Sequence, residues 1–194
     1  MSTLAPITTI SLDVDGVLAR WLAALFKLLD LNEAHVRAAW AAHDPKRPWD
    51  VFQVLDMSAR EGWHAIDNAG AAFWADIEPH AWAQDLYSLC SQYAQTTLVT
   101  SPSYHPSSYA GKAEWINRHF SKSASRLIGN CKPHCAHAGA LLIDDSPTNC
   151  TQFVQAGGRA LLFPGLGNDL HPFADDPMPY VRAQLRLHFG PQLH

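Results

Sequence analysis

Short apolar runs alternate along most of the chain with segments in which apolar residues recur every three or four positions. The runs are rich in β-branched residues and end in polar residues or glycine, which is typical of buried strands. We expect strands at 7–15, 96–100, 126–128, 141–145 and 158–163, and helices at 79–93, 109–120, 149–155 and 178–187. This alternation predicts an α/β fold, a Rossmann-like parallel sheet flanked by helices.

The region that follows the first strand does not continue this alternation. Leu18–Leu31 and Leu31–Ala42 each have helical periodicity, and the remainder predicts short helices and turns with many aromatic residues. No alternating strand pattern is found there. We therefore expect a core domain of 1–17 and 79–194, with a small helical cap of 18–78 inserted in it.

Polar side chains stand at the end of three predicted strands. They are Asp13 and Asp15, Thr100 and Ser101, and Asp144 and Asp145. In a strand, side chains two positions apart share a face, so Asp13 and Asp15 should lie together. Ligands of parallel sheets gather beyond the carboxyl ends of the strands, and we expect these six residues to converge there.

Two adjacent carboxylates repel each other, and either a bound cation or a division of catalytic roles would explain them. An acidic turn is the simpler alternative, because Asp and Gly are common turn residues. An EF-hand loop is excluded, because Leu18 and Ala24 stand where that loop needs Gly and Glu. Asp175-Asp176 has no buried strand before it and is interpreted as an acidic turn.

The composition indicates which binding partners and which cell compartment to expect. Hydrophobic residues make up 47% of the chain, charged residues 16%, and the net charge is −4, so polymeric nucleic acid is not an expected partner. The most apolar helical window, Val17–Leu29, contains Arg20 and Lys27 and is too short to cross a bilayer, so no membrane partner is expected. The first residues lack the pattern of a signal peptide, and four cysteines then suggest free thiols in the cytoplasm. A homodimer is compatible with the sequence, which does not fix the oligomeric state.

Four motifs follow one another along the chain. They are Asp13-Val14-Asp15-Gly16-Val17, Thr100-Ser101, a lysine at position 112 or 132, and Asp144-Asp145. This order resembles that of the haloacid dehalogenase superfamily of phosphatases over about residues 7–163. Within the superfamily, the sequence is most similar to the 5'(3')-deoxyribonucleotidases. The matching segments are 13–19, 73–79, 98–102, 112–115 and 141–145.

The resemblance implies a role for each acidic residue. Asp13 would be the nucleophile and would form an aspartyl-phosphate. Asp15 would protonate the leaving alkoxide and then accept a proton from the attacking water. Mg²⁺ prefers oxygen ligands, and Asp13, the backbone carbonyl of Asp15, and Asp144 would hold it, with Asp145 as a supporting or alternative ligand.

The resemblance also implies how the phosphate group is bound. The Thr100 hydroxyl and the Ser101 amide would bind phosphate oxygens, and a lysine would neutralise charge on the transferring group. We assign the catalytic role to Lys132 and a phosphate contact to Lys112, although the two roles could be exchanged. A solvated surface position is the alternative for either lysine.

Aromatic residues of the cap are the candidates for binding a nucleobase. We expect Trp21, Trp49, Phe73 and Trp74 around the base, where stacking is worth about 1–3 kcal/mol by alanine substitution. Trp21 follows the nucleophile strand where the resembled family has an aromatic residue, and Trp49 follows Lys46-Arg47-Pro48 as in that family's cap. Core packing is the alternative for each of them, and it is our assignment for Trp40 and Trp63.

The segment Cys131–His137 is dense in cysteine and histidine, which could suggest zinc. A tetrahedral site is hard to close from seven consecutive residues, and no second Cys/His pair lies at a suitable spacing. We interpret the segment as a loop beside the phosphate site.

These features lead to a Mg²⁺-dependent phosphomonoesterase for nucleoside 5'-monophosphates, with deoxyribonucleotides as the expected substrates. One alternative is a related phosphatase for another small phosphoester, with purely structural cap aromatics. A second is a non-catalytic domain that binds a phosphorylated ligand. The Asp13/Asp15 pair disfavours the second alternative, because a binding domain needs no general acid.

Overall fold

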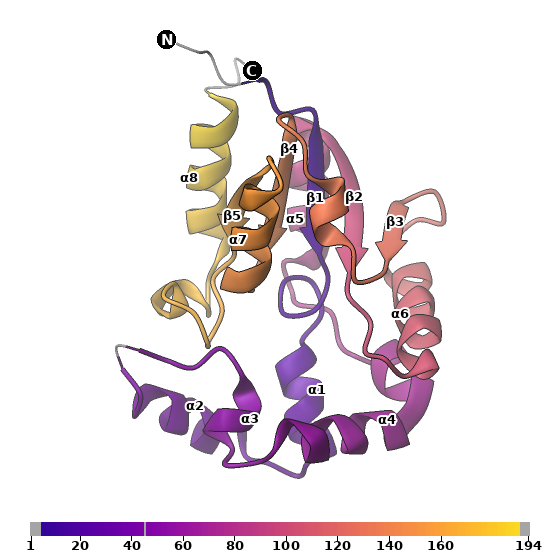
Figure 1. Cartoon of the computed structure of the whole chain (residues 1–194), viewed down its shortest axis with the longest axis vertical. Helices are drawn as coiled ribbons and strands as arrows, with labels where there is room; N and C mark the ends of the chain where they lie inside the picture. Colours follow the sequence, from indigo (N-terminus) through magenta and orange to yellow (C-terminus); the bar gives the residue numbers. More distant parts are fainter. Residues whose placement is uncertain (1–4, 45, 191–194) are drawn as a thin grey trace.

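The computed structural model describes residues 5–44 and 46–190, which form a five-stranded parallel sheet with helices around it (Figure 1). The strand order is β3-β2-β1-β4-β5. The strands are β1 (Thr9–Asp13), β2 (Gln95–Thr100), β3 (Ser125–Ile128), β4 (Ala140–Asp144) and β5 (Arg159–Leu162). The α/β parallel sheet expected from the sequence is confirmed.

Two apolar clusters cover the two faces of the sheet because side chains alternate along each strand. On one face, Leu12, Leu98 and Ile143 join a large cluster with apolar residues of α5, α6 and α8. On the other face, Leu142 packs with Phe153 of α7 in a smaller cluster. The core helices are α5 (Ala83–Tyr93), α6 (Pro106–His119), α7 (Pro147–Gln155) and α8 (Met178–Phe189), with the 3₁₀ turns η1 (Lys132–Cys135) and η2 (His171–Phe173).

Four further helices lie together beyond the carboxyl ends of the strands (Figure 1). They are α1 (Trp21–Leu28), α2 (Glu33–Ala41), α3 (Val51–Val54) and α4 (Ala59–Ala75). Side-chain caps fix the starts of three of them: Asn32 caps α2, Asp50 caps α3, and Ser58 forms a capping box with Glu61 in α4. Gly70, at φ 72° and ψ −157°, kinks α4 near its end, in a backbone conformation that favours glycine.

The structure differs from the predicted elements around the two connections between these helices and the sheet. The expected helix from Pro79 is wrong at its start, because α5 begins only at Ala83. Pro79 instead pairs with Ala19, which also bridges to Asp15, and this explains why the helix predicted from Leu18 begins only at Trp21. Short helices are predicted before residue 79, and the longest element there, α4, consists of two helices joined at the Gly70 kink.

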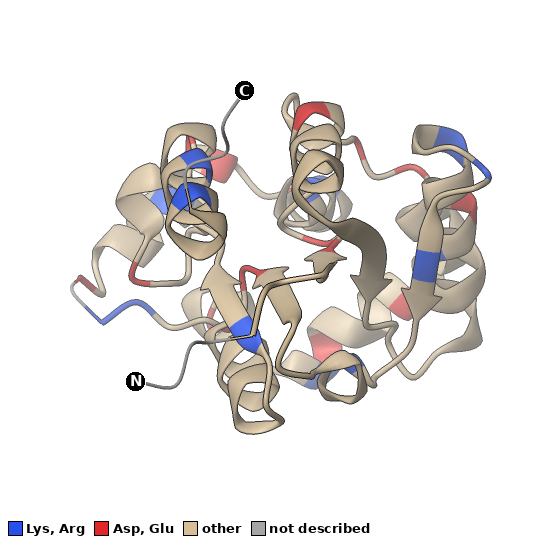
Figure 2. Ribbon diagram, turned by 90° about the horizontal axis from the view of Figure 1, so that it is seen from above, with Lys and Arg blue, Asp and Glu red and all other residues tan. Residues whose placement is uncertain are grey.

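Charged residues are spread over the molecule. In the view from above, basic and acidic residues are interspersed over the helices and strands (Figure 2). None of the helices within 5–44 and 46–190 combines the length and the apolar character that a membrane span requires.

Candidate active site

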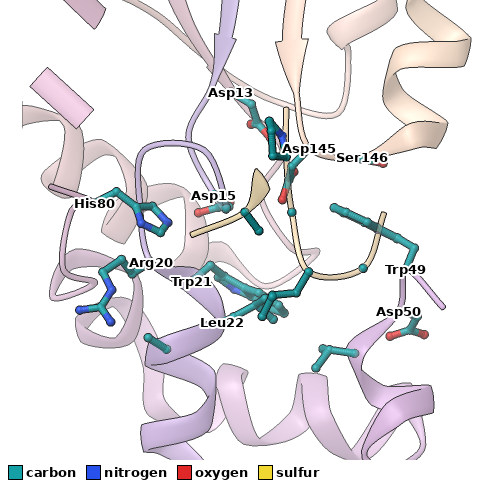
Figure 3. A pocket seen from close by; sticks show the side chains of 18 of the residues that line it. Asp13, Asp15, Arg20, Trp21, Leu22, Trp49, Asp50, His80, Asp145 and Ser146 are labelled. Carbon is teal, nitrogen blue, oxygen red and sulfur yellow. The ribbon is translucent and has the colours of Figure 1, made fainter. Parts of the chain in front are cut away.

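The carboxyl ends of β1, β4 and β2 meet at one edge of the sheet. Leu12 is paired with Ile143 on one side, and Asp13 is paired with Val99 on the other. This register brings Asp13, Asp144 and Thr100 to neighbouring strand ends, as the sequence predicts. Figure 3 shows Asp13 and Asp145 facing a cavity whose opposite side carries Trp21 and Leu22.

Three carboxylates form a compact cluster at this edge. Asp13, Asp144 and Asp145 each offer an oxygen atom, and these atoms all lie within 4.8 Å of one another. Within the described parts of the chain, this is the one group of three or more His, Cys, Asp or Glu side chains that could hold a metal ion. Oxygen donors in such a group fit Mg²⁺, which binds carboxylates and keeps several waters.

The Lys132 ammonium lies between two of these carboxylates. Its Nζ is 2.7 Å from Asp13 Oδ1 and 2.7 Å from Asp144 Oδ2. Burial alone would lower the pKa of Lys132, but the two carboxylates raise it above the ordinary value, so the side chain is charged. Lys132 is 4% exposed, which excludes the solvated surface position considered for it.

The single positive charge of Lys132 does not neutralise the three carboxylates of the cluster. Burial and the adjacent Asp144 raise the pKa of Asp13 to about 7, and the Lys132 ammonium opposes this rise. Burial and the neighbouring Asp13 also hold the pKa of Asp145 well above its ordinary range. The cluster therefore favours a further positive charge, which a divalent cation would supply.

Hydrogen bonds from α7 orient Asp144. The carboxylate accepts from the Ser146 amide at 2.9 Å, and from Asn149 Nδ2 at 3.1 Å to each oxygen. Ser146 caps α7 by accepting from the Asn149 amide, and Pro147 occupies the first turn. Sequence reasoning missed the role of Asn149, although the sequence Ser146-Pro147 does signal a helix start at this position.

Asp15 belongs to a second, adjacent cluster. Its Oδ2 contacts Lys112 Nζ and accepts from Thr100 Oγ1 at 3.2 Å, while Lys112 also donates to Thr100 Oγ1 at 3.0 Å. Lys112 is 2% exposed and Thr100 is fully buried. The Asp15 side chain is thus directed toward Lys112 and Thr100, and the three-carboxylate cluster does not include it.

Gly16 allows the two clusters to pack closely. It has φ 78°, and a Cβ at this position would clash with Asp145 Oδ2. Any other residue would be strained in the backbone and would displace the Asp145 carboxylate.

A cavity of about 570 Å³ opens in front of the acids. Of the residues predicted for the site, it is lined by Asp13, Asp15, Trp21, Trp49, Trp74, Ser101, Lys132 and Asp145. Thr100, Lys112 and Asp144 are buried behind this lining. Phe73 is not brought to the cavity: it packs edge-on against Trp74, with ring centroids 5.2 Å apart.

The cavity also has walls that sequence reasoning did not assign to it. Trp63, which we assigned to packing, lines the cavity, is 37% exposed, and has its ring centroid 6.1 Å from that of Trp21. His80 stacks on Trp82 at 4.2 Å, and burial, with a smaller contribution from the nearby Arg20, lowers the pKa of His80 to about 4, so its imidazole is neutral near pH 7.

Asn168 organises the loop that closes the cavity beside β5. Its Nδ2 donates to the carbonyl oxygens of Asp145 and Phe163 at 2.8 and 2.9 Å, and its Oδ1 accepts from two loop amides. Three of its partners lie within five residues, but the contact that ties the loop to the site is with Asp145, 23 residues away, which no local pattern predicts.

The Cys131–His137 segment forms the turn η1 that presents Lys132 to the acids. His137 is used structurally: its Nε2 is 3.1 Å from Thr9 Oγ1, and its Nδ1 accepts from the Gly139 amide. All four cysteines, which lie within the described residues, are free thiols.

Solved structures of other proteins share this fold. A haloacid dehalogenase-like hydrolase from Streptococcus pneumoniae has a TM-score of 0.54 at 16% identity, covering 92% of this chain and 98% of its own. A hydrolase from Streptococcus pneumoniae TIGR4 has a TM-score of 0.52 at 14% identity, covering 93% and 99%. A haloacid dehalogenase-like hydrolase from Xanthomonas campestris has a TM-score of 0.50 at 11% identity, covering 84% and 85%.

The fold is therefore that of the haloacid dehalogenase-like hydrolases. Residues 6–171 match the family described as 5' nucleotidase, deoxy (pyrimidine), cytosolic type C protein, and the chain belongs to this family. No curated protein matches the chain.

Proposed function

We propose that the protein is a Mg²⁺-dependent phosphomonoesterase that hydrolyses nucleoside 5'-monophosphates, with deoxyribonucleotides as preferred substrates. The observation that carries the proposal is the convergence of Asp13, Asp144, Asp145 and Lys132 beside a cavity with tryptophan walls. The family description, a deoxy (pyrimidine) 5'-nucleotidase of cytosolic type, supports the substrate class and a cytoplasmic location.

In this proposal Asp13, Asp144 and Asp145 would hold the metal ion, and the backbone carbonyl of Asp15 would be a further ligand. Their oxygen atoms have the chemistry that Mg²⁺ prefers, and burial together with the neighbouring carboxylates raises the pKa values of Asp13 and Asp145, an effect that a cation would oppose. When bound, Mg²⁺ reduces the repulsion between an anionic nucleophile and an anionic phosphate.

Asp13 is the nucleophile. Its carboxylate oxygen attacks phosphorus, the P–O bond to the nucleoside breaks, and Asp15 gives its proton to the leaving alkoxide. Water then attacks the aspartyl-phosphate while Asp15 accepts a proton, which releases phosphate and restores the Asp13 carboxylate. Contacts from Lys112 and Thr100 hold Asp15 in place for both proton transfers.

The two lysines then have different roles. Lys132 lines the cavity and contacts Asp13, so it is suited to neutralise charge on the transferring phosphoryl group. Lys112 is buried against Asp15, and a rearrangement would be needed before it could reach a phosphate oxygen. Ser101 lines the cavity and supplies the amide for the phosphate.

The nucleoside occupies the part of the cavity lined by Trp21 and Trp49, whose rings stack on the base. The cap of 18–78 supplies these residues, and the core of 1–17 and 79–194 supplies the reacting groups. The tryptophan rings that line this part of the cavity favour a planar base over a sugar alone, and this is the basis for proposing nucleotides as substrates.

The test is phosphate release from a panel of nucleoside monophosphates and sugar phosphates, with Mg²⁺ and with EDTA. We expect turnover that requires Mg²⁺ and is fastest with nucleotides. Equal turnover of sugar phosphates would point to a phosphatase for another small phosphoester. Binding of nucleotides without turnover would point to a non-catalytic protein.

A further inference from the structure

Trp74 has a contact that the expected role in base binding does not explain. The Lys112 Nζ lies 4.4 Å from the centroid of the Trp74 ring, over its face. A cation in this position is attracted by the negative face of the indole. Trp74 is 2% exposed, so most of the ring is enclosed by protein.

The ring completes the surroundings of a buried ammonium group. Lys112 Nζ contacts Asp15 Oδ2 and donates to Thr100 Oγ1, and the face of Trp74 is its third neighbour. An ammonium that is 2% exposed has lost nearly all its water, so these three neighbours replace its hydration.

The end of α4 is fixed against α6 in a way that holds this contact. Gly111, the residue before Lys112, faces α4 so closely that a Cβ would clash with the Ala71 carbonyl oxygen and lie 2.5 Å from Trp74 Cβ. Trp115 donates from Nε1 to the Ile77 carbonyl oxygen at 2.7 Å. Figure 1 shows the end of α4 beside α6, although α4 begins among the cap helices.

The indole N–H takes no part in this arrangement. Trp74 Nε1 is buried and has no hydrogen-bond partner among the described residues. The ring face, rather than the polar edge, therefore makes the specific contact.

We propose that Trp74 is a positioning residue of the phosphatase site: its ring face holds the Lys112 ammonium against Asp15 and Thr100. This inference rests on the proposed function, in which Asp15 carries the proton. It differs from the expectation that Trp74 stacks on the base, and it makes the last part of α4 a support for the core site.

The first test separates positioning from base binding. Trp74→Leu removes the aromatic face, and we expect kcat for a nucleoside monophosphate to fall about tenfold while KM changes less than twofold. Trp74→Phe keeps an aromatic face, and kcat should stay within about threefold of the wild type. A raised KM at unchanged kcat would overturn the proposal in favour of base stacking, and an equal loss of kcat in Phe and Leu variants would overturn the role of the ring face.

Trp115→Phe is the matched control. It removes a hydrogen bond at the same junction of α4 and α6, but none of the contacts of the Lys112 ammonium. We expect a lower melting temperature with kcat unchanged. A tenfold loss of kcat in this control would mean that general loosening of the junction, rather than the contact with Lys112, causes the Trp74 effect.

The second test measures stability and needs no substrate, so it gives a result even if the proposed function is wrong. The melting temperatures of Trp74→Leu, Lys112→Met and the double variant form a cycle. If the ring supports the ammonium, the double variant should lose about 2–4 °C less than the sum of the single losses. If the losses in melting temperature are additive, the ring does not support the ammonium and the inference is overturned. A wild type that hydrolyses no nucleotide would overturn only the proposed function.

Discussion

The two walls of the cavity are built from different chemistry. On the wall formed by the strand ends, Asp13 and Lys132 are 4–5% exposed, Asp144 is fully buried behind them, and short polar contacts join the three. On the wall formed by α1–α4 and the segment before α3, aromatic side chains predominate beside Glu33 and Arg37, and Trp49 is 42% exposed. The first wall fixes charges in place, and the second offers surface to a ligand.

We expect this difference to divide the roles of the two walls: the strand-end wall determines the rate of the reaction, and the aromatic wall determines the choice of substrate. Preorganised charges at a buried site stabilise a transition state without reorganisation, so changes there should lower kcat. An aromatic wall contacts the substrate equally in the ground state and the transition state, so changes there should raise KM. We propose Trp74 as an exception. It belongs to the aromatic wall, but its ring contacts Lys112, which packs behind the acids of the other wall.

The largest loss of kcat is expected from Asp13→Asn. An amide cannot act as the nucleophile, so kcat should fall by about 10⁴-fold or more while the protein stays folded. The assay is phosphate release, with nucleotide binding followed by calorimetry. Asp176→Asn, at an exposed acid, is the matched control and should keep full activity. Substantial turnover by Asp13→Asn would show that the charged wall does not supply the nucleophile.

The two buried lysines should differ in the size of their effect. Lys132→Met removes the ammonium that contacts Asp13, and kcat should fall by about 10²–10³-fold. Lys112→Met acts through Asp15 and should have a smaller effect, about tenfold to 10²-fold. Lys122→Met, at an exposed lysine, is the control. A larger loss for Lys112→Met than for Lys132→Met would exchange the two roles.

Changes in the aromatic wall should act on KM. Trp21→Ala and Trp49→Ala each remove a stacking surface worth about 1–3 kcal/mol, so KM for a nucleoside monophosphate should rise by about tenfold with kcat little changed. Trp49→Phe keeps a ring and should stay near the wild type. Unchanged KM values in both alanine variants would make the tryptophans purely structural.

The smallest effect on activity is expected from a pair of glycines. Gly70 in α4 and Gly157 after α7 both have positive φ, with open space where a Cβ would stand. Replacement by Ala strains the backbone at both positions and should cost about 1–3 kcal/mol of unfolding free energy, measured by urea denaturation. Only Gly70→Ala should also lower kcat, by less than threefold, because Gly70 directs the segment that carries Trp74. A loss of kcat in Gly157→Ala alone would contradict this difference.

The charged wall could be predicted from the sequence because local rules create it. Polar residues at the ends of buried strands must meet at one edge of a parallel sheet, so Asp13, Thr100 and Asp144 could be placed without coordinates. The burial of Lys112 behind that edge, and its contact with Trp74, depend on how α4 packs on α6. No local pattern encodes this packing.

The aromatic wall is harder to predict from the sequence, because it also depends on how helices pack. Helical periodicity identifies an apolar face but does not say whether that face meets the core or a cavity. Phe73 and Trp63 were both assigned from aromatic character and neighbourhood, and the structure places Trp63, rather than Phe73, at the cavity. The bond from Asn168 to the carbonyl oxygen of Asp145 joins residues 23 positions apart, and no local pattern in the sequence indicates it.

The most direct test of the account is to trap the covalent intermediate. The protein would be mixed with Mg²⁺ and a deoxynucleoside 5'-monophosphate, quenched in acid within milliseconds, digested and analysed by mass spectrometry. We predict phosphate on the peptide that contains Asp13, and none in the Asp13→Asn variant. Product release under single-turnover conditions without any phosphorylated peptide would contradict the assignment of Asp13 as the nucleophile.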